Sequence, residues 1–133
     1  LLRYFRTHSF YLFCIGGIPF TALFFFAPKV FIIILGDSWQ EVGEIVSIIS
    51  LWLFTLLLSM PSVGSYVILK RQKVWLRFTI FNAVMQLTPL LLAYYYSLDM
   101  LQALWGYSVL GAIANILMVM KTHHIIMRRA QYA

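Results

Sequence analysis

Residues 45–69 read IVSIISLWLFTLLLSMPSVGSYVIL and contain no charged side chain. About 20 apolar residues suffice for an α-helix to cross the hydrocarbon core of a bilayer, so this run is long enough for one membrane span. Pro61 removes a backbone hydrogen bond, and Ser59, Ser62 and Ser65 lie close enough in sequence to bond the freed carbonyl group. The stretch therefore predicts a transmembrane helix with a kink near Pro61.

Three further apolar runs flank this one, and they predict membrane spans at about 9–27, 74–96 and 101–120. Pro28, followed by Lys29, is expected to end the first span. Residues 30–35 then form a short apolar segment at the interface or a frayed extension of the helix. All the connections are short, which favours antiparallel hairpins. The sequence thus predicts an all-α integral membrane protein, with four antiparallel transmembrane helices in a single domain over residues 1–133.

The composition excludes a soluble domain of this size. Hydrophobic residues make up 62% of the chain and charged residues 11%, against roughly 45–50% and about 25% in ordinary globular proteins. A soluble fold this small could not bury so much apolar surface. The single cysteine, Cys14, gives no disulfide framework. Because the chain begins at Leu1 without an initiating Met, we expect it to be a piece of a longer protein.

Charged residues are sorted by sign between the two ends of the predicted spans. Nine of the ten basic residues fall at the N-terminal end, between the second and third spans, or at the C-terminal end: Arg3, Arg6, Lys70, Arg71, Lys73, Arg77, Lys121, Arg128 and Arg129. The opposite side holds Lys29 and the four acidic residues, Asp37, Glu41, Glu44 and Asp99. Basic residues favour the cytoplasmic side, so we expect both termini in the cytoplasm. The net charge of +6 is then a topology signal, and we expect no nucleic-acid partner.

The stretch GDSWQEVGE, residues 36–44, is expected to form the turn between the first two spans. Gly36 suits a left-handed residue that ends a helix. Ser38 and Glu41 fit the capping box S-x-x-E, with Ser38 as the N-cap. Acidic side chains at a helix start are stabilised by the helix dipole, and Trp39 would anchor in the headgroup layer. We interpret the stretch as a structural turn at the outer surface, and direct contact with substrate is the alternative.

The run FAPKVFIIILGDSWQEVGEIVSIISLWLF, residues 26–54, combines an apolar span, a break at Pro28 and a G-x-x-W turn at Gly36 and Trp39. In this pattern the chain resembles the C-terminal half of polysaccharide flippases of the Wzx type. These proteins belong to the multidrug/oligosaccharidyl-lipid/polysaccharide exporter superfamily. The next segment, PSVGSYVILKRQKVWL at 61–76, resembles the part of the family that turns at the cytoplasmic face.

The resemblance covers about residues 9–120, and it implies a fold and a function. Such proteins have about twelve spans in two bundles, and they move oligosaccharide linked to polyprenyl pyrophosphate across the bacterial inner membrane for surface polysaccharides such as O-antigen. The chain would be the last part of the second bundle. Its partners would be membrane lipid, the lipid-linked oligosaccharide and the missing N-terminal helices of the same chain. The alternatives are a multidrug exporter of the same superfamily, a small four-span accessory protein, and a membrane enzyme, for which the external loops are too short.

Polar residues inside the third and fourth spans are candidates for a substrate path. Asn82 and Gln86 are four residues apart and share one helix face. Ser108, Ala112 and Asn115 share one face of the next helix. One interpretation is helix packing, because small and amide side chains pack and bond between membrane helices. The other is a sugar-conducting cavity, because amides bond well to hydroxyl groups.

Charged and titratable residues near the span ends give weaker signals. Arg77 lies about one turn inside the third span, where it either extends to the lipid headgroups or contacts the lipid pyrophosphate of the cargo through its guanidinium fork. Lys29 has the same two interpretations at the outer side. His8, His123 and His124 lack the converging ligands that a metal needs. The sequence shows no nucleophile–base pair and no phosphate-binding glycine loop, so we expect no enzyme activity, no metal and no cofactor.

Overall fold

The computed structural model describes the backbone of residues 2–131 and the side chains of residues 7–127. Four long helices joined by short turns make up this part of the chain: α1 (Leu2–Leu35), α2 (Gln40–Ile68), α3 (Gln72–Tyr96) and α4 (Met100–Gln131). A short 3₁₀ helix, η1 (Asp37–Trp39), connects α1 to α2. Each long helix contains a segment that is long and apolar enough to span a membrane. The predicted all-α class with four candidate membrane spans is therefore confirmed.

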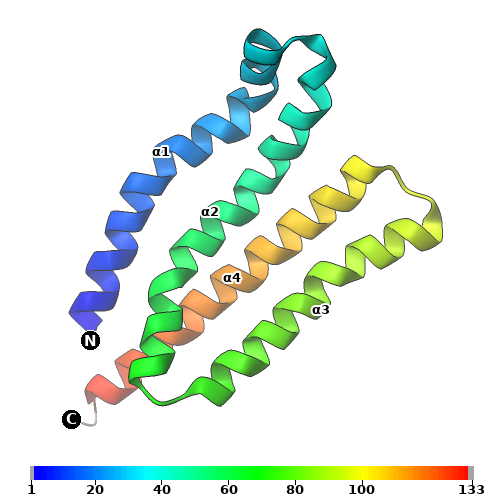
Figure 1. Ribbon diagram of the computed structural model, residues 1–133. Coiled ribbons are helices and arrows are strands. Elements are labelled where there is room, and N and C mark those ends of the chain that lie inside the picture. The colour runs from blue at the N-terminus through cyan, green and yellow to red at the C-terminus, as the bar shows by residue number, and fades with distance from the viewer. Residues whose placement is uncertain (1, 132–133) are drawn as a thin grey trace.

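α1 continues past Pro28, so residues 30–35 extend the first helix and do not form a separate segment. Pro28 has no backbone N–H to donate to the carbonyl of Phe24, one turn earlier. The hydroxyl of Ser47 on α2 donates to that carbonyl instead. One turn before Ser47, a Cβ atom on Gly43 would lie only 2.6 Å from Cα of Pro28. Close contact with α2 thus supports α1 where the sequence predicts its end, and Figure 1 shows a bend near this end of the helix.

α2 also continues through its proline, Pro61, without interruption. Ser59 donates a hydrogen bond of 2.7 Å to the carbonyl of Leu56, and Ser65 donates one of 2.8 Å to the carbonyl of Pro61 itself. Neither serine therefore bonds the carbonyl of Leu57, which is the group that Pro61 leaves without its helical donor. The hydroxyl of Ser62 has no hydrogen-bond partner among the described residues, so the expected bond from these serines to the freed carbonyl is not found.

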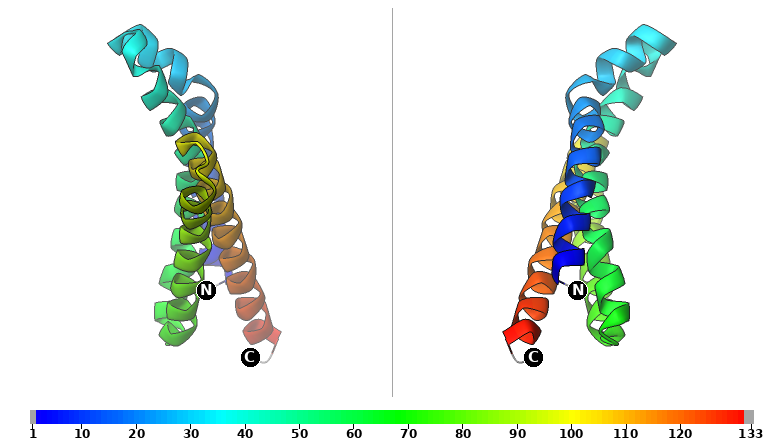
Figure 2. Two further views of the ribbon diagram at one scale, coloured as in Figure 1. Left: turned by 90° about the vertical axis from the view of Figure 1, so that its right-hand side faces the viewer. Right: turned by 90° about the vertical axis from the view of Figure 1, so that its left-hand side faces the viewer.

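The helices do not pack in their order along the chain. α2 packs on α1 and on α4, whereas α3 packs mainly on α4, so the order across the molecule is α1, α2, α4, α3 (Figure 1). Figure 2 shows the helices edge-on, with the tip of the α1–α2 pair leaning to one side and the end of α4 spreading away from the α2–α3 end at the bottom. The turns from α1 to α2 and from α3 to α4 lie at one end of the molecule. The start of α1, the α2–α3 turn and the end of α4 lie at the other end.

This arrangement separates the charged residues along the helix axes. The end with the α1–α2 and α3–α4 turns holds Lys29 and the acidic residues Asp37, Glu41, Glu44 and Asp99. The other end holds the basic residues of the α2–α3 turn and of the adjoining helix ends, among them Lys70, Arg71, Lys73, Arg77 and Lys121. Arg3, Arg6, Arg128 and Arg129 lie outside the residues whose side chains are described. The long apolar stretches between the two ends are the parts that fit a bilayer core.

Small side chains fill the contacts between the helices, and large apolar ones point outward. The buried residues of α2 and α4 include Ser50, Ser59, Ser62, Ser65, Ala112 and Ala114. Small residues let membrane helices approach closely. On the outer faces, Ile18 of α1 is 79% exposed and Tyr94 of α3 is 89% exposed. A layer with this much exposed apolar surface must be covered by lipid or by further protein.

Candidate functional site

The turn between α1 and α2 is built from backbone groups. Gly36 has φ 97° and ψ 171°, a region that residues with a side chain rarely adopt, so the glycine ends α1 as expected. The N–H of Trp39 donates to the carbonyl of Gly36, at 3.1 Å, and the N–H of Gln40 donates to the carbonyl of Asp37. Ser38 lies inside η1, and neither η1 nor α2 has a side-chain cap. The predicted capping box of Ser38 and Glu41 is therefore wrong, because a 3₁₀ turn supplies the acceptors that the cap would have supplied.

The acidic side chains at this turn are exposed or half-buried. Asp37 and Glu41 are exposed, and Glu44 accepts a hydrogen bond of 3.1 Å from the side chain of Gln40. Trp39 is also exposed, as expected for a side chain at a membrane interface. Within residues 7–127, no three His, Cys, Asp or Glu side chains converge in a way that could hold a metal ion. The geometry of the turn thus favours the structural interpretation.

Ser108 and Asn115 lie buried between α4 and α2. The hydroxyl of Ser108 donates a hydrogen bond of 2.6 Å to the carbonyl of Ile48. The side-chain N–H of Asn115 donates to the hydroxyl oxygen of Thr55, at 3.3 Å, and that hydroxyl donates to the carbonyl of Trp52, at 2.8 Å. In each of the two contacts between α4 and α2, the bonded residues are 60 positions apart in the sequence. Of the two interpretations of this helix face, the geometry favours packing.

Asn82 and Gln86 share a half-buried face of α3 that looks toward α4 and α2. A Cβ atom on Gly111 of α4 would lie 2.5 Å from the side-chain nitrogen of Gln86 and 2.6 Å from Cδ1 of Trp52. An amide of α3 and an indole of α2 therefore meet over a glycine of α4. Among the described residues, no hydrogen-bond partner is present for the Asn82 side-chain oxygen, the Gln86 side-chain nitrogen or Nε1 of Trp52. Buried polar groups in this state are uncommon.

A cleft of about 210 Å³ adjoins this place and lies between α2, α3 and α4. Asn82 and Thr79 of α3, Ser59 of α2 and Asn115 of α4 contribute its polar lining, and Met118 is among its apolar residues. The lining carries hydrogen-bonding groups and no charge. The cleft is smaller than the roughly 300–1,000 Å³ that is typical of ligand pockets. It has room for water or for one part of a polar molecule.

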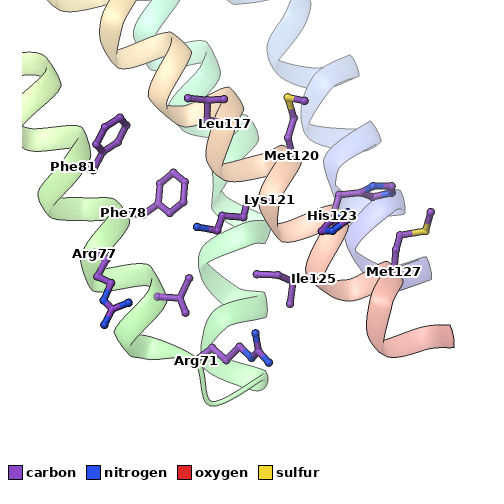
Figure 3. Close-up of a pocket in the computed structure, with 12 residues that line it drawn as sticks. Arg71, Arg77, Phe78, Phe81, Leu117, Met120, Lys121, His123, Ile125 and Met127 are labelled. Atoms are coloured by element: carbon purple, nitrogen blue, oxygen red, sulfur yellow. The ribbon is translucent and has the colours of Figure 1, made fainter. Parts of the chain in front are cut away.

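Arg77 lies in a different place, in a groove of about 1080 Å³ between α3 and the end of α4. Figure 3 shows Arg77, Phe78 and Phe81 on α3 and Lys121 on α4, with Arg71 beside them at the α2–α3 turn. The ammonium group of Lys121 lies 5.0 Å from the centre of the Phe78 ring, a cation–π contact. We call this site the basic groove.

The candidate residues from the sequence thus divide among three places. Ser108 and Asn115 hold α4 to α2, Asn82 and Gln86 lie between α3 and α4, and Arg77 lies in the basic groove. Sequence reasoning missed Trp52 and Thr55, whose only signal was a polar atom in the middle of an apolar run. Comparisons with protein-family models, curated proteins and solved structures found no match to this chain.

Proposed function

We propose that the chain is part of a membrane transporter that moves lipid-linked oligosaccharide across the bacterial inner membrane for the synthesis of surface polysaccharide. The observation that carries the proposal is the group of unpartnered polar atoms on Asn82, Gln86 and Trp52 inside an apolar helix layer. Polar groups at membrane depth are costly, and they are kept where they face protein, water or a substrate pathway. Amide and indole N–H groups with free hydrogen-bonding capacity suit the hydroxyl groups of a sugar.

The positions of the acidic residues favour a transporter of oligosaccharide over a drug exporter that is driven by an ion gradient. All four acidic residues lie at or beside the α1–α2 and α3–α4 turns, so the middle of each span contains none. An exporter of drugs in the same superfamily would usually use carboxylates within its spans as ion sites. The uncharged lining of the cleft, in contrast, is compatible with a neutral glycan. The resemblance to Wzx-type flippases supports the same class of cargo.

We further propose that the four helices are antiparallel members of a larger bundle of about twelve spans. The described layer leaves its outer faces exposed and does not by itself surround a cavity large enough for an oligosaccharide. The remaining helices of a longer chain would cover part of these faces, and lipid would cover the rest. In this proposal the end with the excess of basic residues faces the cytoplasm together with both termini, because basic residues favour that side of the membrane.

Deletion of the gene that encodes the full chain tests the proposed function. We expect lipid-linked glycan to accumulate on the cytoplasmic leaflet and surface polysaccharide to be lost, and a plasmid copy should restore both. Radiolabelled glycan, with enzymatic access to intact and to opened vesicles, measures the leaflet. Normal surface polysaccharide in a deletion strain that has no second transporter would show that the proposal is wrong.

A further inference from the structure

The basic groove combines two kinds of surface in one trough. Its lower part, near the α2–α3 turn, presents the cations Arg71, Arg77 and Lys121 (Figure 3). Its walls toward the middle of the helices are apolar, with Phe78 and Phe81 from α3, and Leu117 and Met120 from α4. Its volume of about 1080 Å³ is slightly above the range of about 300–1,000 Å³ that is typical of ligand sites.

The charge of the groove is of one sign. No acidic side chain lines it within the described part of the chain. The four acidic residues of the sequence lie at the far ends of the helices, so no carboxylate competes for the groove cations. Arg77 and Arg71 are exposed, and their guanidinium forks can each bond two oxygens of a phosphate. The third cation, Lys121, extends from α4 toward the Phe78 ring of α3 and contacts it.

The apolar walls select among the anions that these cations attract. A free phosphate would use only the charged part and would leave the aromatic and aliphatic walls in contact with water. An amphiphile fills both parts, because its phosphate bonds the cations while its acyl chains lie along the walls. The order of the two parts also matches a bilayer, because Arg71 and Arg77 lie at or near the α2–α3 turn and Lys121 lies in the last three turns of α4, whereas Phe81 and Leu117 lie closer to the middle of the spans.

We propose that the basic groove binds one anionic phospholipid from the leaflet at the basic ends of the helices. Its phosphate lies between Arg77 of α3 and Lys121 of α4, with Arg71 nearby. One acyl chain runs along Phe81 and Leu117. The bound lipid bridges α3 and α4, and it stabilises the part of the pair that lies farthest from the α3–α4 turn. This site is separate from the proposed sugar path, and it does not depend on the cargo.

Binding of a fluorescent phosphatidylglycerol to the purified full chain in neutral detergent tests the site. The double variant R77Q/K121Q removes two groove cations, and the single variants R77Q and K121Q provide milder changes should the double variant fail to fold. The matched control is K70Q/K73Q, which removes two exposed charges at the same end of the molecule but outside the groove. Unlabelled phosphatidylglycerol, phosphatidylcholine and glycerol phosphate serve as competitors, and circular dichroism checks the helix content.

We expect R77Q/K121Q to weaken binding by roughly tenfold to thirtyfold, since each cation near an anionic lipid contributes about 1 kcal/mol. Each single variant should weaken binding by about threefold to fivefold on the same basis. K70Q/K73Q should stay within about twofold of the parent, and only unlabelled phosphatidylglycerol should compete well. An equal loss in the groove and control variants would show that bulk charge alone attracts the lipid. Equal competition by phosphatidylcholine, or by glycerol phosphate, would also overturn the proposal.

Discussion

The hydroxyl of Ser47 on α2 donates a hydrogen bond to the backbone carbonyl of Phe24 on α1. Pro28 is the residue that deprives this carbonyl of its helical donor. The second helix therefore completes the hydrogen bonding of the first at the place where a proline interrupts it. We expect Ser47→Ala to destabilise the α1–α2 pair by about 1 kcal/mol, because a part-buried acceptor loses its partner.

A double variant separates this effect from a general packing defect. In Pro28→Ala the backbone N–H of residue 28 returns, so adding Ser47→Ala should then cost less than it does in the parent chain. Ser50→Ala is the control, because Ser50 bonds the Ser47 carbonyl within its own helix. Unfolding in increasing fractions of an anionic detergent, followed by circular dichroism, gives the free energies. Equal costs of Ser47→Ala in both backgrounds would contradict the assignment.

Gly43 is the position where α1 and α2 approach most closely at this bend. Its missing Cβ would lie 2.6 Å from Cα of Pro28 and 3.0 Å from the carbonyl oxygen of Ala27, which are backbone atoms. Gly43→Val should force the helices apart and cost about 1–3 kcal/mol, as overpacking usually does. Gly64→Val is the matched change, since no atom lies within 4 Å of that missing Cβ, and it should be close to neutral. The same unfolding measurement applies. An unchanged free energy of unfolding in Gly43→Val would contradict the close approach of α1 and α2 at this residue.

Asn115 and Thr55 form the side-chain bond that joins α4 to α2. We expect a coupling of about 0.6 kcal/mol between Asn115→Ala and Thr55→Ala, which is the average of such bonds in membrane proteins. A double-mutant cycle on detergent unfolding measures it. Thr122→Ala should show no coupling to Thr55→Ala, because Thr122 bonds a carbonyl of its own helix. Strictly additive effects of the Asn115 and Thr55 changes would contradict a bond between them.

Asn82 and Gln86 carry the proposed sugar contacts. The double variant N82A/Q86A should reduce surface polysaccharide by about tenfold or more in the complemented deletion strain, which corresponds to about 1.4 kcal/mol of lost interaction. The abundance of the variant protein in the membrane should stay near normal. The Asn82 side-chain oxygen and the Gln86 side-chain nitrogen have no hydrogen-bond partner among the described residues, so the substitutions do not break a bond at these atoms. Gln102→Ala removes an exposed amide on α4 and should complement fully. Full complementation by N82A/Q86A would show that these two residues are not needed for transport of the sugar.

The orientation of the chain can be tested with single cysteines. Cys14 is exposed, so it is first replaced by alanine. A cysteine at Ser38, in the α1–α2 turn, should react with a membrane-impermeant maleimide in whole cells, and one at Gln72, at the start of α3, should react only after the cells are opened. The reverse pattern would place the basic ends outside and would contradict the expected topology.

The helices themselves could be predicted from the sequence because their apolar runs are long and their charges are sorted. The sequence also predicts that Gly36 ends a helix. In the structure this glycine ends α1 with a φ of 97°, which other residues avoid. The continuation of α1 past Pro28 was not predictable. A proline removes a helical hydrogen bond, and the contact with Ser47 and Gly43 of α2, which supports α1 past Pro28, is visible only in the fold.

The packing order was beyond the reach of the sequence. Short connections suggest that successive helices are neighbours, yet α4 lies between α2 and α3. The shared face of Ser108 and Asn115 was visible as a spacing, but its partners, Ile48 and Thr55, could come only from the fold. For the same reason, Lys121 gave no signal that it would share a groove with Arg77, since 44 positions separate them in the sequence.

α4 is synthesised after α3, yet it takes a place beside α2, which was made earlier. Until α4 arrives, the face of α2 that carries Ile48 and Thr55 has no partner, and α3 lacks the helix on which it packs. Within the described part of the chain, α2 and α3 therefore become a packed unit only when α4 lies between them. A chain cut before Met100 would keep its α1–α2 pair and leave α3 alone in the lipid.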